Sequence, residues 1–122
     1  MYNKIGEFKR AISYFERSAQ LREHIGNIEA SLVAKSYQAS AMRESGDLAN
    51  AALVHKDVAS KLSRENYYYL TTGIELATDR IGQKQWQAAV DIVADLKQIQ
   101  KIYTPQQLDL LLIQMRAALE LN

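Results

Sequence analysis

A single pattern of side-chain sizes occurs three times in this chain, at nearly constant spacing. Leu48 lies 40 residues after Phe8, and Trp86 lies 38 residues after Leu48. An alanine follows each of these large residues after three positions, and the three alanines are Ala11, Ala51 and Ala89. A period of about 40 residues is long enough for two helices and their turns, so it is typical of stacked helical hairpins.

Helical spacing of apolar residues runs through the whole chain, and no segment alternates long enough to predict a strand. Asn27 and Asp47 follow glycines and are good N-caps, so each is predicted to begin a helix. Thr104 is predicted to cap the last helix, with Pro105 as its first helical residue. Six helices are predicted, at about 7–24, 27–45, 47–62, 65–81, 84–102 and from 104 onward. The glycines predicted to lie at helix ends, outside the helices, are Gly6, Gly26, Gly46 and Gly82.

Composition restricts the classes of partner. The 122 residues predict one domain, and 48% apolar with 24% charged residues is typical of a globular chain. A net charge of +1 does not favour direct nucleic-acid binding, which usually needs a basic face. No apolar run is long enough to cross a membrane, and early charged residues argue against a signal peptide. The absence of cysteine fits a cytoplasmic protein, which is the location we expect.

The residues needed for catalysis do not occur in any recognised arrangement. His24 and His55 lie in different predicted helices, and without cysteine they form no zinc-site pattern. The glycines stand singly rather than in a phosphate-binding loop, and no serine lies in a G-x-S-x-G motif. We therefore expect a protein that is not an enzyme and has no cofactor and no metal. His55 occupies a packing position and is predicted to be satisfied within the protein.

On its repeated residues the chain resembles a tetratricopeptide-repeat protein. The likeness is carried by Gly6-Glu7-Phe8 with Ala11 and Phe15, by Gly46-Asp47-Leu48 with Ala51, and by Trp86, Ala89 and Val93. The segment LREHIGNIEASLVA, residues 21–34, resembles the link between hairpins in the longer repeat variant, of about 40 residues, that is common in bacterial signalling and transcription regulators. This resemblance implies an all-α fold of stacked antiparallel hairpins, a right-handed α-solenoid of about six helices and three repeats.

The phase of the repeats bears on the ends of the chain. Only five residues precede Gly6, so the first hairpin lacks most of its first helix, and the sixth helix has no partner after it. Solenoids usually carry polar end caps. We expect that residues 1–122 form a single helical-repeat domain of a longer protein. The alternative is that another copy of the chain covers the open end, which would give a homodimer.

The resemblance implies a protein–protein interaction scaffold that binds a peptide or partner protein in a concave groove lined by first helices. In this sequence those helices are 27–45 and 65–81, and the scaffold would be the sensor or adaptor segment of a bacterial regulator. The predicted groove residues recur on one helix side. They are Val33, Ser36, Tyr37, Ser40, Arg43, Glu44, Thr71, Glu75, Thr78 and Asp79. Two alternatives stay open: these residues form a solvated face, or the module self-associates through its uncapped helical ends.

Three further features leave questions for the structure. Tyr67, Tyr68 and Tyr69 point about 100° apart on a helix, so they cannot all be core residues. Two alternatives stay open for them: packing between the hairpins, or an aromatic binding surface. Gly73 in mid-helix predicts a close contact between two helices. The strongly apolar segment 108–121 either packs on the fifth helix or provides part of a docking face.

Overall fold

The computed structural model describes residues 4–99 and 104–121. These residues form six α-helices and no strand, which confirms the predicted all-α class. The helices are α1 (Lys4–His24), α2 (Ile28–Glu44), α3 (Leu48–Lys61), α4 (Tyr67–Gly82), α5 (Trp86–Leu96) and α6 (Thr104–Leu121). No helix within these two ranges is long and apolar enough to cross a membrane.

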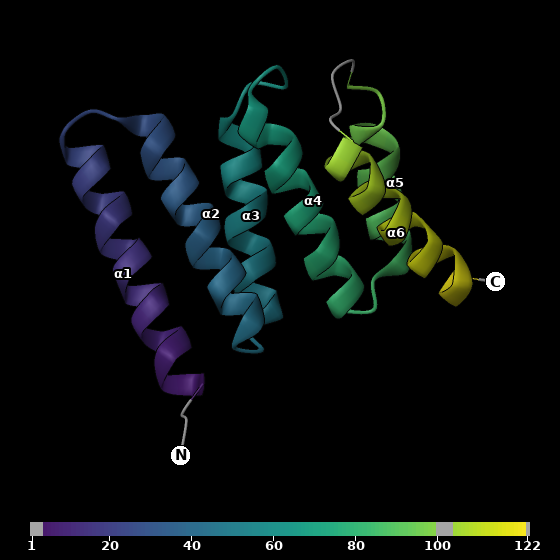
Figure 1. The fold of residues 1–122 in the computed structure, drawn as a ribbon, viewed down its shortest axis with the longest axis horizontal. Coiled ribbons are helices and arrows are strands. Elements are labelled where there is room, and N and C mark those ends of the chain that lie inside the picture. Colours follow the sequence, from purple (N-terminus) through teal and green to yellow (C-terminus); the bar gives the residue numbers. More distant parts are fainter. Residues whose placement is uncertain (1–3, 100–103, 122) are drawn as a thin grey trace.

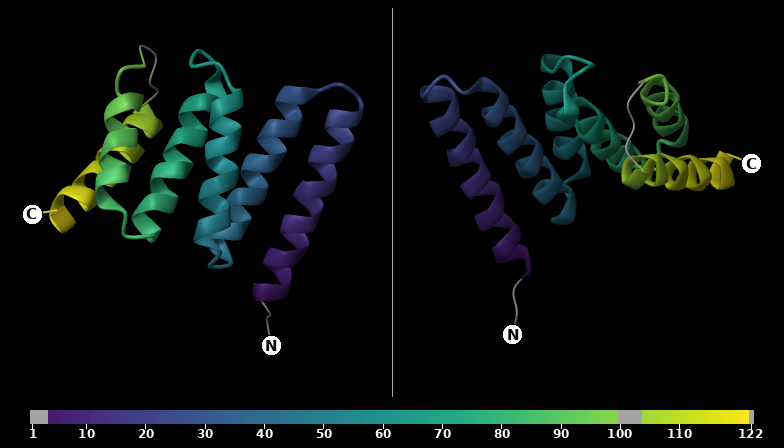
Figure 2. Two further views of the ribbon diagram at one scale, coloured as in Figure 1. Left: turned by 180° about the vertical axis from the view of Figure 1, so that it is seen from behind. Right: turned by 45° about the horizontal axis from the view of Figure 1, so that its top comes forward.

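Each helix packs against the next one along the chain, so the molecule is a row of antiparallel hairpins (Figure 1). The helices α2, α4 and α6 form one layer, and α3 and α5 lie in the other (Figure 2). Direct contacts of α4 with both α2 and α6 hold the first layer together. The predicted stack of helical hairpins is therefore confirmed.

The turns on either side of α2 have the conformation that their sequence predicts. Gly26 (φ 85°) and Gly46 (φ 97°) both adopt the left-handed conformation that a β-carbon disfavours. The Asn27 side chain then accepts a hydrogen bond from the backbone N–H of Ala30 at 3.1 Å. The Asp47 carboxylate caps α3 in the same way, at 3.3 Å. Both predicted N-caps are confirmed, because the chemistry that fixes them is local.

Two predicted helix boundaries are wrong by several residues. The first helix begins at Lys4, so Gly6 lies inside α1 instead of before it. The fifth helix ends at Leu96 instead of near residue 102. After Leu96 the chain makes a turn, in which the N–H of Ile99 donates to the backbone oxygen of Leu96 at 3.1 Å, and Ile99 packs against the apolar core formed with α4 and α6. Residues 100–102, the last part of that predicted helix, lie outside the described residues.

Gly82 also differs from its predicted role. It is the last residue of α4, and the left-handed position after the helix is occupied by Lys84 (φ 60°). A β-carbon on Gly82 would lie 2.8 Å from Cδ2 of Leu48, which is too close for an ordinary contact. Glycine at this position therefore allows α3 and α4 to approach each other, and a lysine takes the strained turn.

Lys84→Gly is expected to raise the free energy of unfolding by about 0.5–1 kcal/mol, because glycine adopts a positive φ without a steric penalty. Urea unfolding followed by circular dichroism measures the change. The matched control is Gly46→Lys, the reverse exchange at the equivalent turn one repeat earlier, which should lower stability. A Lys84→Gly protein no more stable than the parent would contradict the assignment of strain to this residue.

The main apolar core lies between α4, α5 and α6. Its buried members are Leu70, Ile74 and Ala77 of α4, Val93 and Leu96 of α5, and Leu110 of α6. A β-carbon on Gly73 would lie 2.7 Å from Cδ2 of Leu96, so the predicted close helix contact at Gly73 is confirmed. The repeat alanines Ala51 and Ala89 are fully buried, where their small size lets neighbouring helix axes approach.

Candidate partner-binding groove

The ten predicted groove residues all lie on α2 and α4, which are neighbours in the first layer. Val33, Ser36 and Tyr37 from α2 face Thr71 from α4 across a narrow cavity of about 150 Å³. Tyr67 and Tyr68, at the start of α4, line the same cavity. The structure therefore brings these predicted residues together along one seam between the two helices.

Beneath this seam, an acid and a histidine form a fully buried pair that joins α3 to α4. His55 Nδ1 lies 2.5 Å from Oδ2 of Asp79, and neither side chain is exposed to solvent. On the other side of the ring, His55 Nε2 lies 3.2 Å from the backbone oxygen of Ser36 in α2. Both ring nitrogens thus face protein oxygens, which confirms the prediction that His55 is satisfied within the protein.

Arg43 extends this network from α2 to α4. Its Nη1 donates to Oδ1 of Asp79 at 3.1 Å, and its Nη2 lies 2.6 Å from Oε2 of Glu75. The same Glu75 oxygen accepts a hydrogen bond from the Ser40 hydroxyl at 3.1 Å. Burial lowers the pKa of the Arg43 guanidinium, but the attraction and hydrogen bonds of Glu75 and Asp79 outweigh it, so this pKa lies above its ordinary value.

This network is a structural joint rather than an open binding surface. Asp79 is fully buried and Arg43 is mostly covered, so their polar atoms are used within the protein. Among the described residues, no buried side-chain nitrogen or oxygen lacks a hydrogen-bond partner. The Thr78 hydroxyl is also used internally, since it donates to the backbone oxygen of Ile74 at 2.9 Å. Glu44 stays exposed at the end of α2. The use of these residues in binding remains a prediction.

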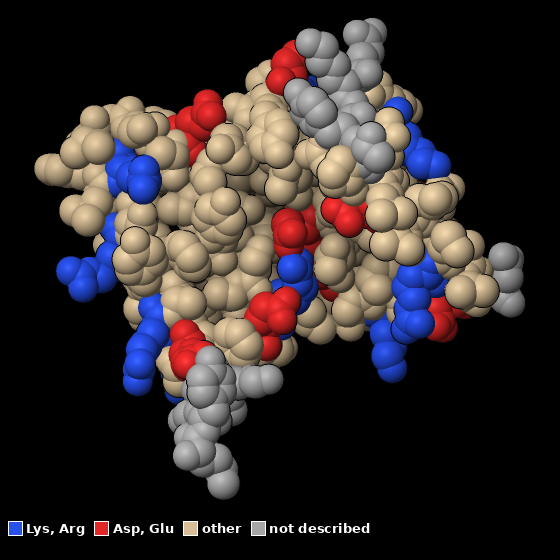
Figure 3. Space-filling view, viewed as in Figure 1, with Lys and Arg blue, Asp and Glu red and all other residues tan. Residues whose placement is uncertain are grey.

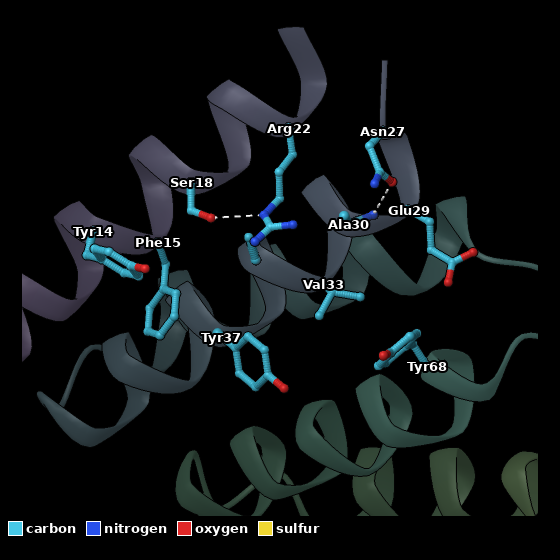
Figure 4. A pocket seen from close by; sticks show the side chains of 11 residues that line it. Tyr14, Phe15, Ser18, Arg22, Asn27, Glu29, Ala30, Val33, Tyr37 and Tyr68 are labelled. Carbon is cyan, nitrogen blue, oxygen red and sulfur yellow. Dashed lines mark hydrogen bonds between the residues drawn. The ribbon is translucent and has the colours of Figure 1, made fainter. Parts of the chain in front are cut away.

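A larger hollow, of about 590 Å³, opens between α1, α2 and the start of α4 (Figure 4). Phe15 of α1 lies against Tyr37 of α2 with ring centroids 5.5 Å apart, and Tyr14 meets Phe15 edge to face at the same distance. Val33 and Tyr68 face each other across the open space in Figure 4. We call this feature the aromatic hollow.

The three consecutive tyrosines divide between core and surface. Tyr69 packs against the core cluster, and Arg64 lies over its ring at 5.5 Å. Tyr67 and Tyr68, with rings 5.3 Å apart and nearly perpendicular, line the cavities described above. Tyr14, Phe15 and Tyr68 were not among the predicted site residues. The aromatic run at 67–69 was the one sequence signal that could have found Tyr68.

The charges around these cavities are mixed. On the face seen in Figure 3, much of the surface carries no charge, and acidic and basic side chains lie side by side near its middle. Arg22 and Glu29 give the aromatic hollow one charge of each sign. Lys9, Arg10 and Arg17 line an adjoining depression on α1, which shares Tyr14 and Ser18 with the hollow. The hollow therefore favours an occupant with large apolar side chains rather than a strongly charged one.

The described part of the chain contains no group of three or more His, Asp or Glu side chains that could hold a metal ion. Comparisons with protein-family models, with curated proteins and with solved structures give no match. The function is therefore inferred from the residues that line the seam and the aromatic hollow.

Proposed function

We propose that this chain is a non-enzymatic scaffold that binds a peptide or a partner protein across α2 and α4. The observation that carries the proposal is the concentration of aromatic side chains beside the seam between these helices. Tyr37 and Tyr67 are more than half exposed there, next to the part-buried Tyr68. Tyrosine is enriched at recognition surfaces because it contributes contact area together with a polar group.

The network beneath the seam supports the same proposal. Arg43 is joined to Glu75 and Asp79, and this holds α2 and α4 at a fixed distance before any partner arrives. A preformed groove loses less conformational entropy on binding than one that must first order itself. The resemblance to tetratricopeptide repeats points to the same use. In that reading the chain is a cytoplasmic sensor or adaptor segment of a bacterial regulator.

The test uses short random peptides displayed on phage and selected against the whole chain. A selected peptide is then titrated against the parent and against Tyr37→Ala and Tyr68→Ala, with fluorescence anisotropy as the readout. Loss of either aromatic anchor should weaken binding about tenfold or more. Leu53→Ala, an exposed residue of α3 outside the groove, is the matched control and should bind as the parent does.

Circular dichroism checks that the helices of each variant are intact. Selected peptides whose affinity is unchanged in both tyrosine variants would show that the binding surface lies elsewhere. Failure to select any peptide would count against peptide recognition by this groove.

A further inference from the structure

The last helix exposes a long apolar stripe that faces away from the core. Four residues at positions i, i+4, i+7 and i+11 share this side of α6. They are Leu108, Leu112, Met115 and Leu119, and each is 54–76% exposed. The opposite side of α6 already carries Leu110 and Ala117, which are buried. We call the exposed set the α6 stripe.

The repeat spacing identifies what the α6 stripe corresponds to in the other first helices. Its four residues lie 38 positions after Leu70, Ile74, Ala77 and Ile81 of α4, and those lie 38 positions after Leu32, Ser36, Ala39 and Arg43 of α2. In α4, Leu70, Ile74 and Ala77 form the core with α5 and with Leu110 of α6. In α2, Ser36 contacts His55 of α3 and Arg43 contacts Glu75 of α4. The stripe therefore corresponds to the side of α2 and α4 that packs on the two helices following each of them. We call α2, α4 and α6, which each begin a hairpin, the first helices.

The matching surface lies at the other end of the stack, on α1 and α2. Phe15 and Ser18 of α1 correspond by repeat spacing to His55 and Val58 of α3 and to Val93 and Leu96 of α5. All four residues of α3 and α5 are at most 2% exposed, because a first helix covers them. Phe15 and Ser18 are only partly buried and line the aromatic hollow instead. Among the described residues, no first helix covers this pair of helices.

We propose that a second copy of this chain places its α6 in the aromatic hollow, so that copies associate head to tail. The α6 stripe would then meet α1 and α2 of the next copy as the equivalent side of α4 meets α5 and α6 within one copy. The contact continues the interfaces already present between the hairpins. Four large apolar side chains would fill a hollow lined by Tyr14, Phe15 and Tyr37. This inference does not rest on the proposed peptide-binding function.

Such a contact joins two different surfaces, so each added copy leaves one stripe and one hollow free until a ring closes, and the contact predicts oligomers larger than a dimer. Sedimentation equilibrium over a range of concentrations tests this directly. The parent chain should rise in mass from near 13.8 kDa through the dimer to larger species. A closed dimer would stop at twice the mass of one chain.

Two double variants block the two surfaces separately. Leu112→Glu with Leu119→Glu places charges on the α6 stripe, and both positions are exposed, so the fold should survive. Tyr14→Glu with Ala30→Glu places charges in the hollow. Tyr14 is 69% exposed, and Ala30 is the third residue of α2, where glutamate favours helix formation. Leu53→Glu, at an exposed leucine of α3, is the matched control and should associate as the parent does.

Each double variant alone should remain a monomer. An equal mixture of the two should form a one-to-one dimer and nothing larger, because only one intact stripe and one intact hollow are available. A parent chain that is monomeric throughout would overturn the proposal and leave the hollow to another segment of the same polypeptide or to a partner. Persistent dimers of either variant alone would overturn it in favour of like-with-like contacts.

Discussion

Asp79→Ala is expected to lower the free energy of unfolding by about 3–5 kcal/mol, the usual cost of removing one partner from a buried ion pair. The carboxylate is fully buried and lies within hydrogen-bond distance of both His55 and Arg43. Without it, His55 Nδ1 loses its acceptor, and Arg43 keeps Glu75 and the more distant, exposed Glu44. Alanine itself fits the position, because the equivalent residues of α2 and α6 are Ala41 and Ala117. Urea unfolding followed by circular dichroism gives the change.

A second substitution separates the loss of the network from a general disturbance of the core. His55→Phe introduces the residue that α1 carries at the equivalent position, Phe15. Added to Asp79→Ala, it should recover a large part of the lost stability, because it removes the polar group left without a partner. Asp57→Ala breaks an exposed pair with Lys61 and should change stability by only about 0.5 kcal/mol. Equal effects of Asp57→Ala and Asp79→Ala would contradict the assigned role of the network.

Leu110→Ala is expected to lower the free energy of unfolding by about 2–5 kcal/mol, since it opens a cavity where α6 meets the core. Leu110 is only 1% exposed and belongs to the cluster that joins α4, α5 and α6. Leu112→Ala, two residues along the same helix but exposed, should change stability by about 0.5 kcal/mol or less in dilute protein.

The single tryptophan provides an independent readout of the same change. Arg116 of α6 lies over the Trp86 ring of α5, 5.6 Å from its centroid. Fluorescence from Trp86 should therefore report the separation of α6 from α5. In Leu110→Ala, we expect this signal to change at lower urea than the circular dichroism of the remaining helices. Coincident transitions would show that α6 unfolds together with the rest of the stack.

The helices and their stacking could be predicted because their determinants are local or periodic. Asn27 and Asp47 cap helices by hydrogen bonds to residues only three positions away in the sequence. The spacing of the alanines marks where two helix axes approach each other. The end of α5 at Leu96 could not be predicted in this way, because no glycine or proline marks it in the sequence. Gly82 was misassigned because its small size serves a contact with Leu48 from another helix.

For the candidate site, the sequence placed part of the lining on α2 and α4 but missed Tyr14, Phe15 and Tyr68, and it did not predict the buried network. Arg43, Glu75 and Asp79 were placed together because they share one side of their helices. Whether such residues face a partner or each other depends on how far apart the two helices lie. The periodicity of residues along each helix does not give that distance. The aromatic hollow joins residues of three helices, with Phe15 and Tyr68 far apart in the sequence. Its existence follows only from how those helices are placed.

The buried joint between His55 and Asp79 also bears on how this chain can have evolved. The two residues are 24 positions apart and belong to different hairpins, as do Arg43 and Glu75. Duplication, loss or exchange of one hairpin at the turn around residues 62–66 would separate both pairs. The buried charged groups would then have no partner. We therefore expect the two hairpins that meet at this turn to be exchanged or duplicated together rather than singly. The junction between α5 and α6, where Val93 and Ala117 stand at the positions of His55 and Asp79, carries no such constraint.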